Sequence, residues 1–333
     1  MKTELIESGD IKRAARLIKE GELVVFPTET VYGLGANAYN NEAVGMIFVV
    51  KKRPITNPLI VHVDSIEQIR ELVSYIPRSA EILMHKFTPG PMTFVLKNAG
   101  RVSRLVCGGL SSIAIRIPRD PVALSLIKMS GVPIAAPSAN LSKRPSATNF
   151  AMANRELNGL VRGIIKHDGR SDIGIESTVV GFTEAGDVLI LRPGAVTREA
   201  IQESLDQEFS VEHALEGEAA ASPGNLLEHY RPRIPVYLFK RQDNIRKYFL
   251  NWETKILITR DTLNSYWFGK FRTTENMRVY NTLDEYASEM YKEFVVSERS
   301  YRQILAEYTH NSGLGYSINN RLIKASLNKF ISS

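Results

Sequence analysis

Apolar residues in the first two hundred positions follow two alternating spacings. Ile11, Ala14 and Ile18 recur with helical period, which predicts a helix over residues 11–20 that ends at Gly21. Short apolar runs bounded by prolines, glycines or polar residues predict buried strands. These runs occupy residues 23–27, 59–63, 93–97, 113–117, 132–136, 177–182 and 188–192.

Helical patterns separate several of the predicted strands. Asn41 is expected to cap a helix that runs to Phe48, and Asp64 or Ser65 another. The alternation predicts an α/β or mixed α+β domain, with an open twisted sheet and helices around a basic concave cleft. The direct step between the last two strands of this region favours some antiparallel pairing.

The pattern changes after residue 202. Residues 202–221 contain six acids and no lysine or arginine, and they end in "EGEAAASPG", which favours a linker. Beyond it the pattern predicts strands at 236–240, 255–260 and 277–280, a helix near 243–251 and a long helix from Leu283. We therefore expect three parts, listed by residue number: a catalytic domain over 1–202, a linker or lid over 203–234, and a small Rossmann-like α/β domain over 235–333.

Charge narrows the range of partners. The net charge is +6, and between Ile82 and Arg155 ten cations accompany a single acid, Asp120. A run this one-sided points to an anionic partner, either a phosphate-bearing small molecule or a nucleic acid. The single cysteine, Cys107, excludes an intrachain disulfide. A polar start and the lack of an apolar run of about 18 residues predict a cytoplasmic protein without a membrane segment.

Several catalytic patterns are missing from the sequence. It contains no H-E-x-x-H, G-x-S-x-G or D-F-G motif, and its six histidines lack metal-ligand spacing. We therefore expect neither covalent catalysis nor a metal site built by the protein.

The stretch "FPTETVYGLGA" places polar groups at the carboxyl end of the first apolar strand, where ligands bind in open α/β sheets. Its "GLGANA" fits a dinucleotide-binding pattern, but the glycines begin seven residues past that strand and Arg53 stands where a ribose-binding acid belongs. That interpretation is rejected, and a simple turn at the glycines remains open.

The stretch "KKRPITNPL" concentrates positive charge before the strand that contains His62. In an extended segment Lys51 and Arg53 would share a face, and an arginine fork with a lysine suits a triphosphate. A histidine inside a strand is more often structural. Arg116 lies among apolar residues and needs an anionic partner, either a ligand or a distant acid.

The segment from Pro133 to Thr148 runs from an apolar strand into small hydroxyls, an amide and two cations. Such a loop can donate hydrogen bonds to phosphates, although it lacks P-loop spacing. "GIESTVV" and "LRPGAV" also place polar groups at strand ends, including Ser177 and Arg192.

Taken together, these stretches resemble the threonylcarbamoyl-AMP synthase family in its long, two-domain form. The matching segments, in chain order, are "FPTETVYGLGANA", "KKRPITNPLIVHV", "PGPMTFVLK", "IAIRIP", "PIAAPSAN", "RPSAT", "GIESTVV" and "LRPGAV", and "GLGYSINNRLIKAS" resembles the closing motif of the long form. The resemblance implies a YrdC-like domain followed by a smaller domain.

The resemblance also implies an activity. The family joins L-threonine, bicarbonate and ATP into threonylcarbamoyl-adenylate and pyrophosphate, a nucleotidyl transfer with Mg²⁺ carried by ATP and no organic cofactor. A partner transferase complex then modifies tRNA; direct tRNA binding by this chain is not implied.

The family's residue roles carry over by motif. Lys51, Arg53 and Arg116 would be the catalytic cations, with Arg116 pairing the carboxylate of threonine. The ATP-binding residues would be Lys51, Arg53, Asn57, Ser112, Ser138, Asn140, Ser146, Arg192, His229 and Tyr230. The threonine-binding residues would be Thr28, Tyr32, His62, Arg116 and Ser177.

This sequence departs from the family around the expected lid. "PGNLLEHYRP" has Asn225, Glu228 and Arg231 in altered places, which puts the tightness of lid closure in doubt. Two alternatives to the synthase remain. One is an RNA-binding module without catalysis, and the other a carbamoyl- or acyl-phosphate hydrolase that shares the first domain. Threonine-dependent pyrophosphate release would distinguish them.

Overall fold

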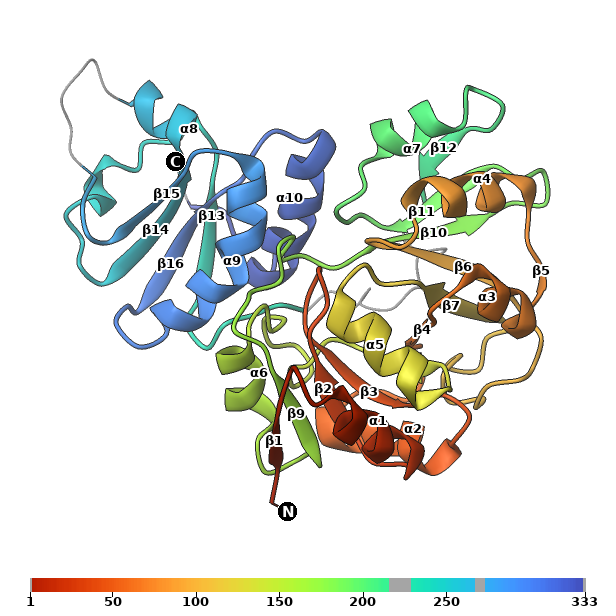
Figure 1. The fold of residues 1–333 in the computed structure, drawn as a ribbon. Helices are drawn as coiled ribbons and strands as arrows, with labels where there is room; N and C mark the ends of the chain where they lie inside the picture. The colour runs from red at the N-terminus through yellow and green to blue at the C-terminus, as the bar shows by residue number, and fades with distance from the viewer. Residues whose placement is uncertain (1, 216–228, 267–272, 332–333) are drawn as a thin grey trace.

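A computed structural model describes residues 2–215, 229–266 and 273–331. The chain forms two α/β units, each built around its own sheet (Figure 1). The first unit is a mixed sheet with helices on both faces, and the second is a smaller parallel sheet. The prediction of a mixed α/β fold is confirmed.

The strands of the first unit are β1 (Glu4–Glu7), β2 (Val24–Phe26), β3 (Gly33–Asn37), β4 (Ile60–His62), β5 (Val73–Tyr75), β6 (Met92–Asn98), β7 (Ser112–Arg116), β8 (Ile134–Ala135), β9 (Gly163–Lys166), β10 (Thr178–Phe182), β11 (Val188–Arg192) and β12 (Val211–His213). Their order is β1-β9-β2-β3-β8-β4-β7-β6-β10-β11-β12, with β5 paired to β6. β10 and β11 pair antiparallel, as the short connection between them predicts.

The helices of the first unit are α1 (Ile11–Lys19), α2 (Asn41–Lys51), α3 (Ile66–Leu72), α4 (Arg78–Phe87), α5 (Pro121–Ser130), α6 (Phe150–Leu157) and α7 (Arg198–Ser204). α1 and α5 lie side by side over one face of the sheet, where Ile18 and Ile127 pack on Phe26 in one apolar cluster (Figure 1). Ser65 caps α3, one of the two predicted alternatives. The cap of α2 is Asn40 rather than Asn41, because the Asn40 side chain accepts from the backbone N–H groups of Glu42 and Ala43.

β3 is one of five strands of the first unit that the apolar pattern did not predict, together with β1, β5, β9 and β12. Its glycines have a packing role, because a Cβ on Gly35 would lie 2.8 Å from both Ile134 Cγ2 and the Phe26 ring. "GLG" is therefore neither a free turn nor a phosphate loop. Glycine lets β3 pass close beneath Phe26, between β2 and β8.

The predicted linker over 203–234 begins too early. β12 lies inside that range and pairs parallel to β11, so the first sheet extends to His213. The acidic composition of this stretch concealed the buried Val211, which anchors the strand. Residues 216–228, which include the altered positions Asn225 and Glu228, lie outside the described residues.

The second unit contains β13 (Val236–Phe239), β14 (Thr254–Thr259), β15 (Met277–Tyr280) and β16 (Gln303–Glu307), with α8 (Arg260–Ser265), α9 (Leu283–Ser297) and α10 (Gly313–Ser326). All its strands are parallel, in the order β13-β16-β14-β15. The helix predicted near 243–251 was wrong: only a 3₁₀ turn forms there, η2 over Arg246–Tyr248.

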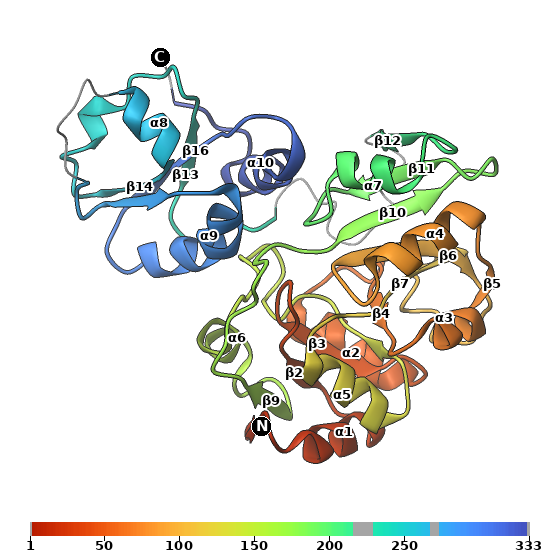
Figure 2. The same ribbon diagram turned by 45° about the horizontal axis from the view of Figure 1, so that its top comes forward.

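The two units meet through α9 and α10. Both views place these helices on the side of the second sheet that faces the first unit, with α8 on the far side (Figures 1 and 2). Ser317 of α10 donates to the carbonyl of Gly194 at 2.7 Å, so the contact is specific. Of the helices within the described ranges, none has the length and hydropathy needed to span a bilayer.

Candidate active site

A polar pocket lies at the carboxyl ends of several strands of the first sheet. Residues that follow β2 and β8 line it together with the ends of β4, β7 and β11. This is the sheet edge at which α/β proteins bind ligands. The predicted residues that line the pocket are Thr28, Tyr32, Arg53, His62, Arg116, Ser138, Ser177, Arg192, His229 and Tyr230.

Arg116, the last residue of β7, has both an acid partner and access to the pocket. Its guanidinium lies 2.7 Å from Glu29 Oε1, and it donates to Thr30 Oγ1 at 2.8 Å and to the carbonyl of Gly90 at 3.1 Å. The sequence left either a ligand or a distant acid as the anionic partner of Arg116, and the structure shows the distant acid, Glu29. The close Glu29 contact lies outside hydrogen-bond geometry, so the NH2 group of Arg116 retains donors that a ligand carboxylate could use.

Glu29 remains ionised beside Arg116. Burial would raise the pKa of this carboxyl, but Arg116 and the backbone N–H of Arg119 outweigh burial and lower it. Glu29 and Arg116 are both almost inaccessible to solvent. The ion pair therefore fixes the guanidinium of Arg116 at the pocket wall. Sequence alone did not reveal this pair, because Glu29 and Arg116 lie far apart along the chain.

Arg53 also lines the pocket, and the oxygens of Asn57 and Pro58 to which it donates are neutral. It donates to the carbonyls of Asn57 at 3.1 Å and Pro58 at 2.8 Å and to the side-chain oxygen of Asn57. Burial and the nearby Arg192 lower the pKa of Arg53 to about 9. Within the described ranges no carboxylate forms an ion pair with Arg53. A cation held in this way favours an anionic ligand.

Lys51 does not line the pocket. The prediction that Lys51 and Arg53 share the face of an extended segment is wrong, because α2 continues through Lys51 and ends at Lys52 in a left-handed conformation with φ 53°. The buried ammonium of Lys51 donates to the carbonyls of Ser138 and Asn140. Lys51 thereby holds the loop that follows β8.

The loop after β8 is ordered by its own amide. Asn140 Nδ2 donates to the carbonyls of Leu141 at 2.8 Å and Arg144 at 2.9 Å. Asn140 Oδ1 is buried and has no hydrogen-bond partner among the residues that the structure describes, so it remains available as an acceptor. Ser138 lines the pocket. Asn57, Asn140 and Ser146 are buried and do not line it.

The remaining predicted residues differ in environment. Thr28 Oγ1 donates to the carbonyl of Val31 at 2.6 Å and is built into the turn after β2. Ser177 Oγ lies 2.8 Å from Thr93 Oγ1 and accepts from Arg192 at 3.0 Å. Ser112 begins β7, at the opposite end of that strand from Arg116, and does not line the pocket.

Two buried rings in the pocket have strongly shifted pKa values. Burial, with a smaller contribution from Arg116, lowers the pKa of His62 to about 3, so the imidazole is neutral at physiological pH. Burial also raises the pKa of the Tyr32 hydroxyl, which therefore remains protonated. Both side chains thus contribute to the pocket in their neutral forms.

Glu176 is the functional residue that sequence reasoning missed. It lines the pocket, accepts from Ser146 Oγ at 2.5 Å and from Tyr291 of α9 at 3.2 Å, and pairs with Arg321 Nε of α10 at 3.1 Å. Burial would raise the pKa of Glu176, but Arg321, Arg192 and Ser146 together lower it to about 2. The available signal was its position in "GIESTVV", beside the predicted Ser177.

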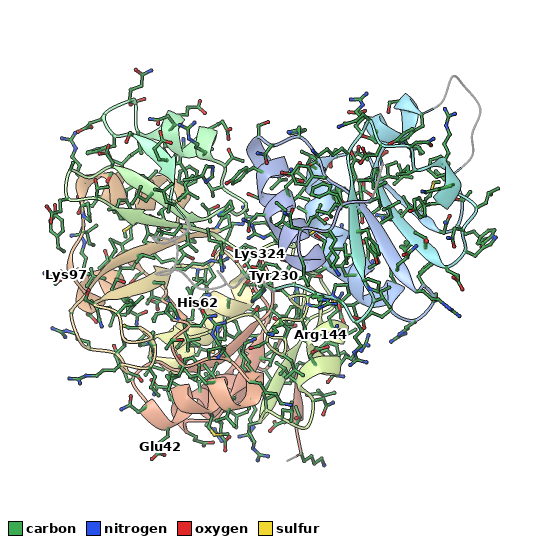
Figure 3. All side chains as sticks on the ribbon, turned by 180° about the vertical axis from the view of Figure 1, so that it is seen from behind. Glu42, His62, Lys97, Arg144, Tyr230 and Lys324 are labelled. Carbon is green, nitrogen blue, oxygen red and sulfur yellow. The ribbon has the colours of Figure 1, made fainter. Side chains whose placement is uncertain are left out.

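His229 and Tyr230 close the pocket next to Glu176. Their rings lie 4.0 Å apart, and Tyr230 stacks on Tyr291 at 5.3 Å. Tyr230 and Lys324 of α10 lie where the two units meet, and His62 lies deeper in the first unit (Figure 3). With both rings in place the cavity measures about 50 Å³, far below the roughly 300–1,000 Å³ of typical small-molecule sites.

Comparisons with known proteins agree with this architecture. A family model described as "Telomere recombination" matches residues 16–194, and one described as "Threonylcarbamoyl-AMP synthase, C-terminal domain" matches residues 196–326. A threonylcarbamoyl-AMP synthase of Pyrococcus abyssi is 40% identical over 97% of this chain and 96% of its own length. One of Bacillus subtilis is 38% identical over 95% and 92%.

Two solved structures match the whole chain. The P. abyssi Sua5 protein complexed with L-threonine has a TM-score of 0.86 at 35% identity and covers 99% of both chains. A variant of that protein, in which a histidine and the tyrosine after it are replaced by alanine, has a TM-score of 0.84 at 36% identity over 99% and 98%.

Proposed function

The chain belongs to the threonylcarbamoyl-AMP synthase family. We propose that the polar pocket of the first unit, called the first pocket below, binds L-threonine and ATP side by side, and that the protein joins them there through bicarbonate. The observation that carries this proposal is the presence of two arginines, the half-buried Arg53 and the buried Arg116, in one pocket lined by hydroxyls at strand ends. One arginine suits a polyphosphate and the other a carboxylate. The reaction is the first step of tRNA threonylcarbamoyladenosine formation.

The chemistry needs no nucleophile from the protein. The amine of threonine takes up bicarbonate with loss of water, or dissolved carbon dioxide, and becomes a carbamate. A carbamate oxygen attacks the α-phosphorus of ATP, and pyrophosphate leaves as the P–O bond to it breaks. This is a nucleotidyl transfer, and fixed positioning of the reactants can supply roughly 7–11 kcal/mol of the barrier.

The cations in and beside the pocket have distinct roles in this proposal. Arg116 binds the threonine carboxylate while Glu29 holds its guanidinium in place. Arg53 and Arg192 face the phosphates. Lys51 acts through the backbone by holding the loop that carries Ser138. Direct contact of Lys51 with the triphosphate stays a prediction from the resemblance.

We further propose that Mg²⁺ reaches the site bound to ATP. The two buried carboxylates beside the pocket, Glu29 and Glu176, are each paired with an arginine, and an engaged carboxylate is a poor ligand for a hard cation. Delivery of the adenylate to a tRNA-modifying transferase and a cytoplasmic location also stay predictions.

Pyrophosphate release tests the reaction. The protein is incubated with ATP, bicarbonate and each of several amino acids, and the adenylate is identified by mass spectrometry. Threonine-specific release is expected. In Arg53→Gln the rate should fall about 10²–10³-fold, the usual cost of losing one preorganised donor. Arg104→Gln, which replaces an exposed arginine of the basic stretch between Ile82 and Arg155, is the matched control. Near-normal turnover in Arg53→Gln, or release without an amino acid, contradicts the proposal.

We also propose that His229 and Tyr230 act as a lid. The residual space is too small for a nucleotide, so these rings must move to admit one, and their return would shield the carbamate from water. Deleting residues 203–232 would also remove β12, so Tyr230→Ala is the cleaner variant. It should slow adenylate formation, whereas the exposed Tyr75→Ala should not. Wild-type rates in Tyr230→Ala would disprove the lid.

A further inference from the structure

A second cavity lies in the second unit, far along the chain from the site described above. It measures about 470 Å³, a size typical of small-molecule sites. Its lining comes from the segments 240–242, 259–262, 281–283 and 307–310, which stand at or directly after the carboxyl ends of β13, β14, β15 and β16. Because these strands are all parallel, four successive loops converge on one edge of the sheet.

The floor of this cavity carries a buried acid. Glu307 ends β16, an inner strand of the sheet, and is only 4% exposed. Its carboxylate accepts from the backbone N–H of Thr259 at 2.6 Å, from Thr259 Oγ1 at 3.0 Å and from Thr262 Oγ1 at 2.6 Å. A carboxylate has about four acceptor positions, so one remains for a donor from a ligand. Burial raises the pKa of Glu307 despite these contacts.

The rim of the cavity is positive. Lys240, Arg241 and Arg260 are exposed there with one exposed acid, Asp261, so the rim carries more positive than negative charge. In the described part of the chain no carboxylate lies within ion-pair distance of the three cations. Arg260 Nε donates to Asn281 Oδ1 at 3.4 Å, which ties the loops after β14 and β15 together. Exposed guanidinium and ammonium groups around one opening favour a phosphate.

An aromatic side wall completes the arrangement. Tyr308 follows Glu307 directly, lines the cavity and is half-buried. Its ring is held edge-on by Phe330 at 5.5 Å between centroids. A fixed aromatic face can stack a planar base. The cavity therefore combines cations for a phosphate, an acid for a sugar hydroxyl and a ring for a base.

We propose that the second unit binds a ribonucleoside phosphate in this cavity. The phosphate lies against Lys240, Arg241 and Arg260, Glu307 accepts from a ribose hydroxyl, and the base stacks on Tyr308. The size of the cavity and the combination of three kinds of contact favour a nucleotide over inorganic phosphate. This site is independent of the first pocket and does not rest on the function proposed for it.

Equilibrium dialysis of the full chain with AMP tests the proposal, with ribose 5-phosphate and inorganic phosphate as separate probes. The first pocket can also take AMP, so binding is measured in two variants. Arg53→Gln should weaken AMP binding in the first pocket only, and Arg241→Gln/Arg260→Gln should weaken AMP binding in the second cavity. We expect AMP to bind the Arg53→Gln protein, and we expect Arg241→Gln/Arg260→Gln in that background to weaken this binding at least about tenfold.

The replaced arginines of the second cavity are exposed, so the variant should melt at the same temperature as its parent. Tyr308→Leu should weaken AMP binding and leave ribose 5-phosphate binding unchanged. Two results would overturn the proposal: AMP binding in Arg53→Gln that is insensitive to the second-cavity substitutions, or AMP binding no tighter than that of inorganic phosphate. Failure of the synthase assay would affect neither result.

Discussion

The buried carboxylate of Glu176 gives the most quantitative test of the structure. It accepts from Ser146 and Tyr291 and pairs with Arg321, so it links the pocket to α9 and α10. Glu176→Gln keeps the shape of the side chain and removes its charge. The guanidinium of Arg321, which is fully buried, then loses its counter-charge.

Two routes give the size of the effect. The pKa of Glu176 is about 2 in place of 4.5, and at about 1.4 kcal/mol per pH unit this corresponds to about 3 kcal/mol of stability at pH 7. Breaking a buried ion pair by removing one partner typically costs about 3–5 kcal/mol. We therefore expect the free energy of unfolding to fall by about 3 kcal/mol at pH 7.

The sign of the pH dependence follows from the lowered pKa. The stabilisation is fully present above about pH 4.5, where the carboxyl is ionised in both folded and unfolded chains. It is lost as the pH falls from about 4.5 towards 2, because the unfolded chain then binds a proton that the folded chain excludes. The difference in stability between wild type and Glu176→Gln should shrink over that range.

Chemical denaturation followed by circular dichroism measures both effects, with exposed Glu184→Gln as the matched control. A double-mutant cycle with Arg321→Met isolates the pair, and the double variant should be less destabilised than the sum of the singles. A loss below about 1 kcal/mol at pH 7, or additive single effects, would refute the assignment of Glu176 as an ionised anchor.

Three further predictions concern other buried positions. Lys51→Ala should lower the free energy of unfolding by about 2–5 kcal/mol in denaturant titrations, because it empties a core position and leaves two carbonyls without their donor; unchanged stability would show that the ammonium does not hold the loop. Gly35→Ala should cost about 1–3 kcal/mol through overlap with Phe26, and a melting curve should show Gly9→Ala, which has open space, close to wild type. His62→Gln should lose less stability than wild type between about pH 6.5 and 4, because the folded imidazole has a pKa of about 3 and resists the proton that the unfolded chain takes up; parallel pH profiles would contradict this.

Local pattern predicted many of the strands and helices, but it missed β1, β3, β5, β9, β12 and β16. Apolar runs located β2, β4, β6, β7, β10 and β11, and the period of Ile11, Ala14 and Ile18 located α1. These elements could be predicted because the spacing of their own apolar side chains matches the period of a strand or a helix. β3 escaped prediction because glycine has a low strand propensity, and Gly35 is required by Phe26 and Ile134, which belong to the two neighbouring strands.

The polar contacts of the site were harder to predict. Strand-end position identified Thr28, Arg116 and Ser177 as candidates, but not the acids that hold the cations. Arg321 reaches Glu176 across 145 residues, and only the packing of the two units brings them together. The Lys51 side chain does not line the pocket, because α2 runs three residues beyond its predicted end. Propensity arguments do not locate helix ends that closely.

The pairing of β1 with β9 has a consequence for synthesis of the protein. Residues 4–7 reach their parallel partner only after residues 163–166 have been made. At an elongation rate of about 5–20 residues per second this interval is roughly 10–30 s. During this interval the amino-terminal strand has no neighbouring strand to accept hydrogen bonds from its N–H groups. Glu176 lacks its ion-pair partner for longer, because Arg321 is synthesised near the end of the chain. A ribosome-bound nascent chain should therefore recruit holding chaperones early and become protease-resistant only near its release.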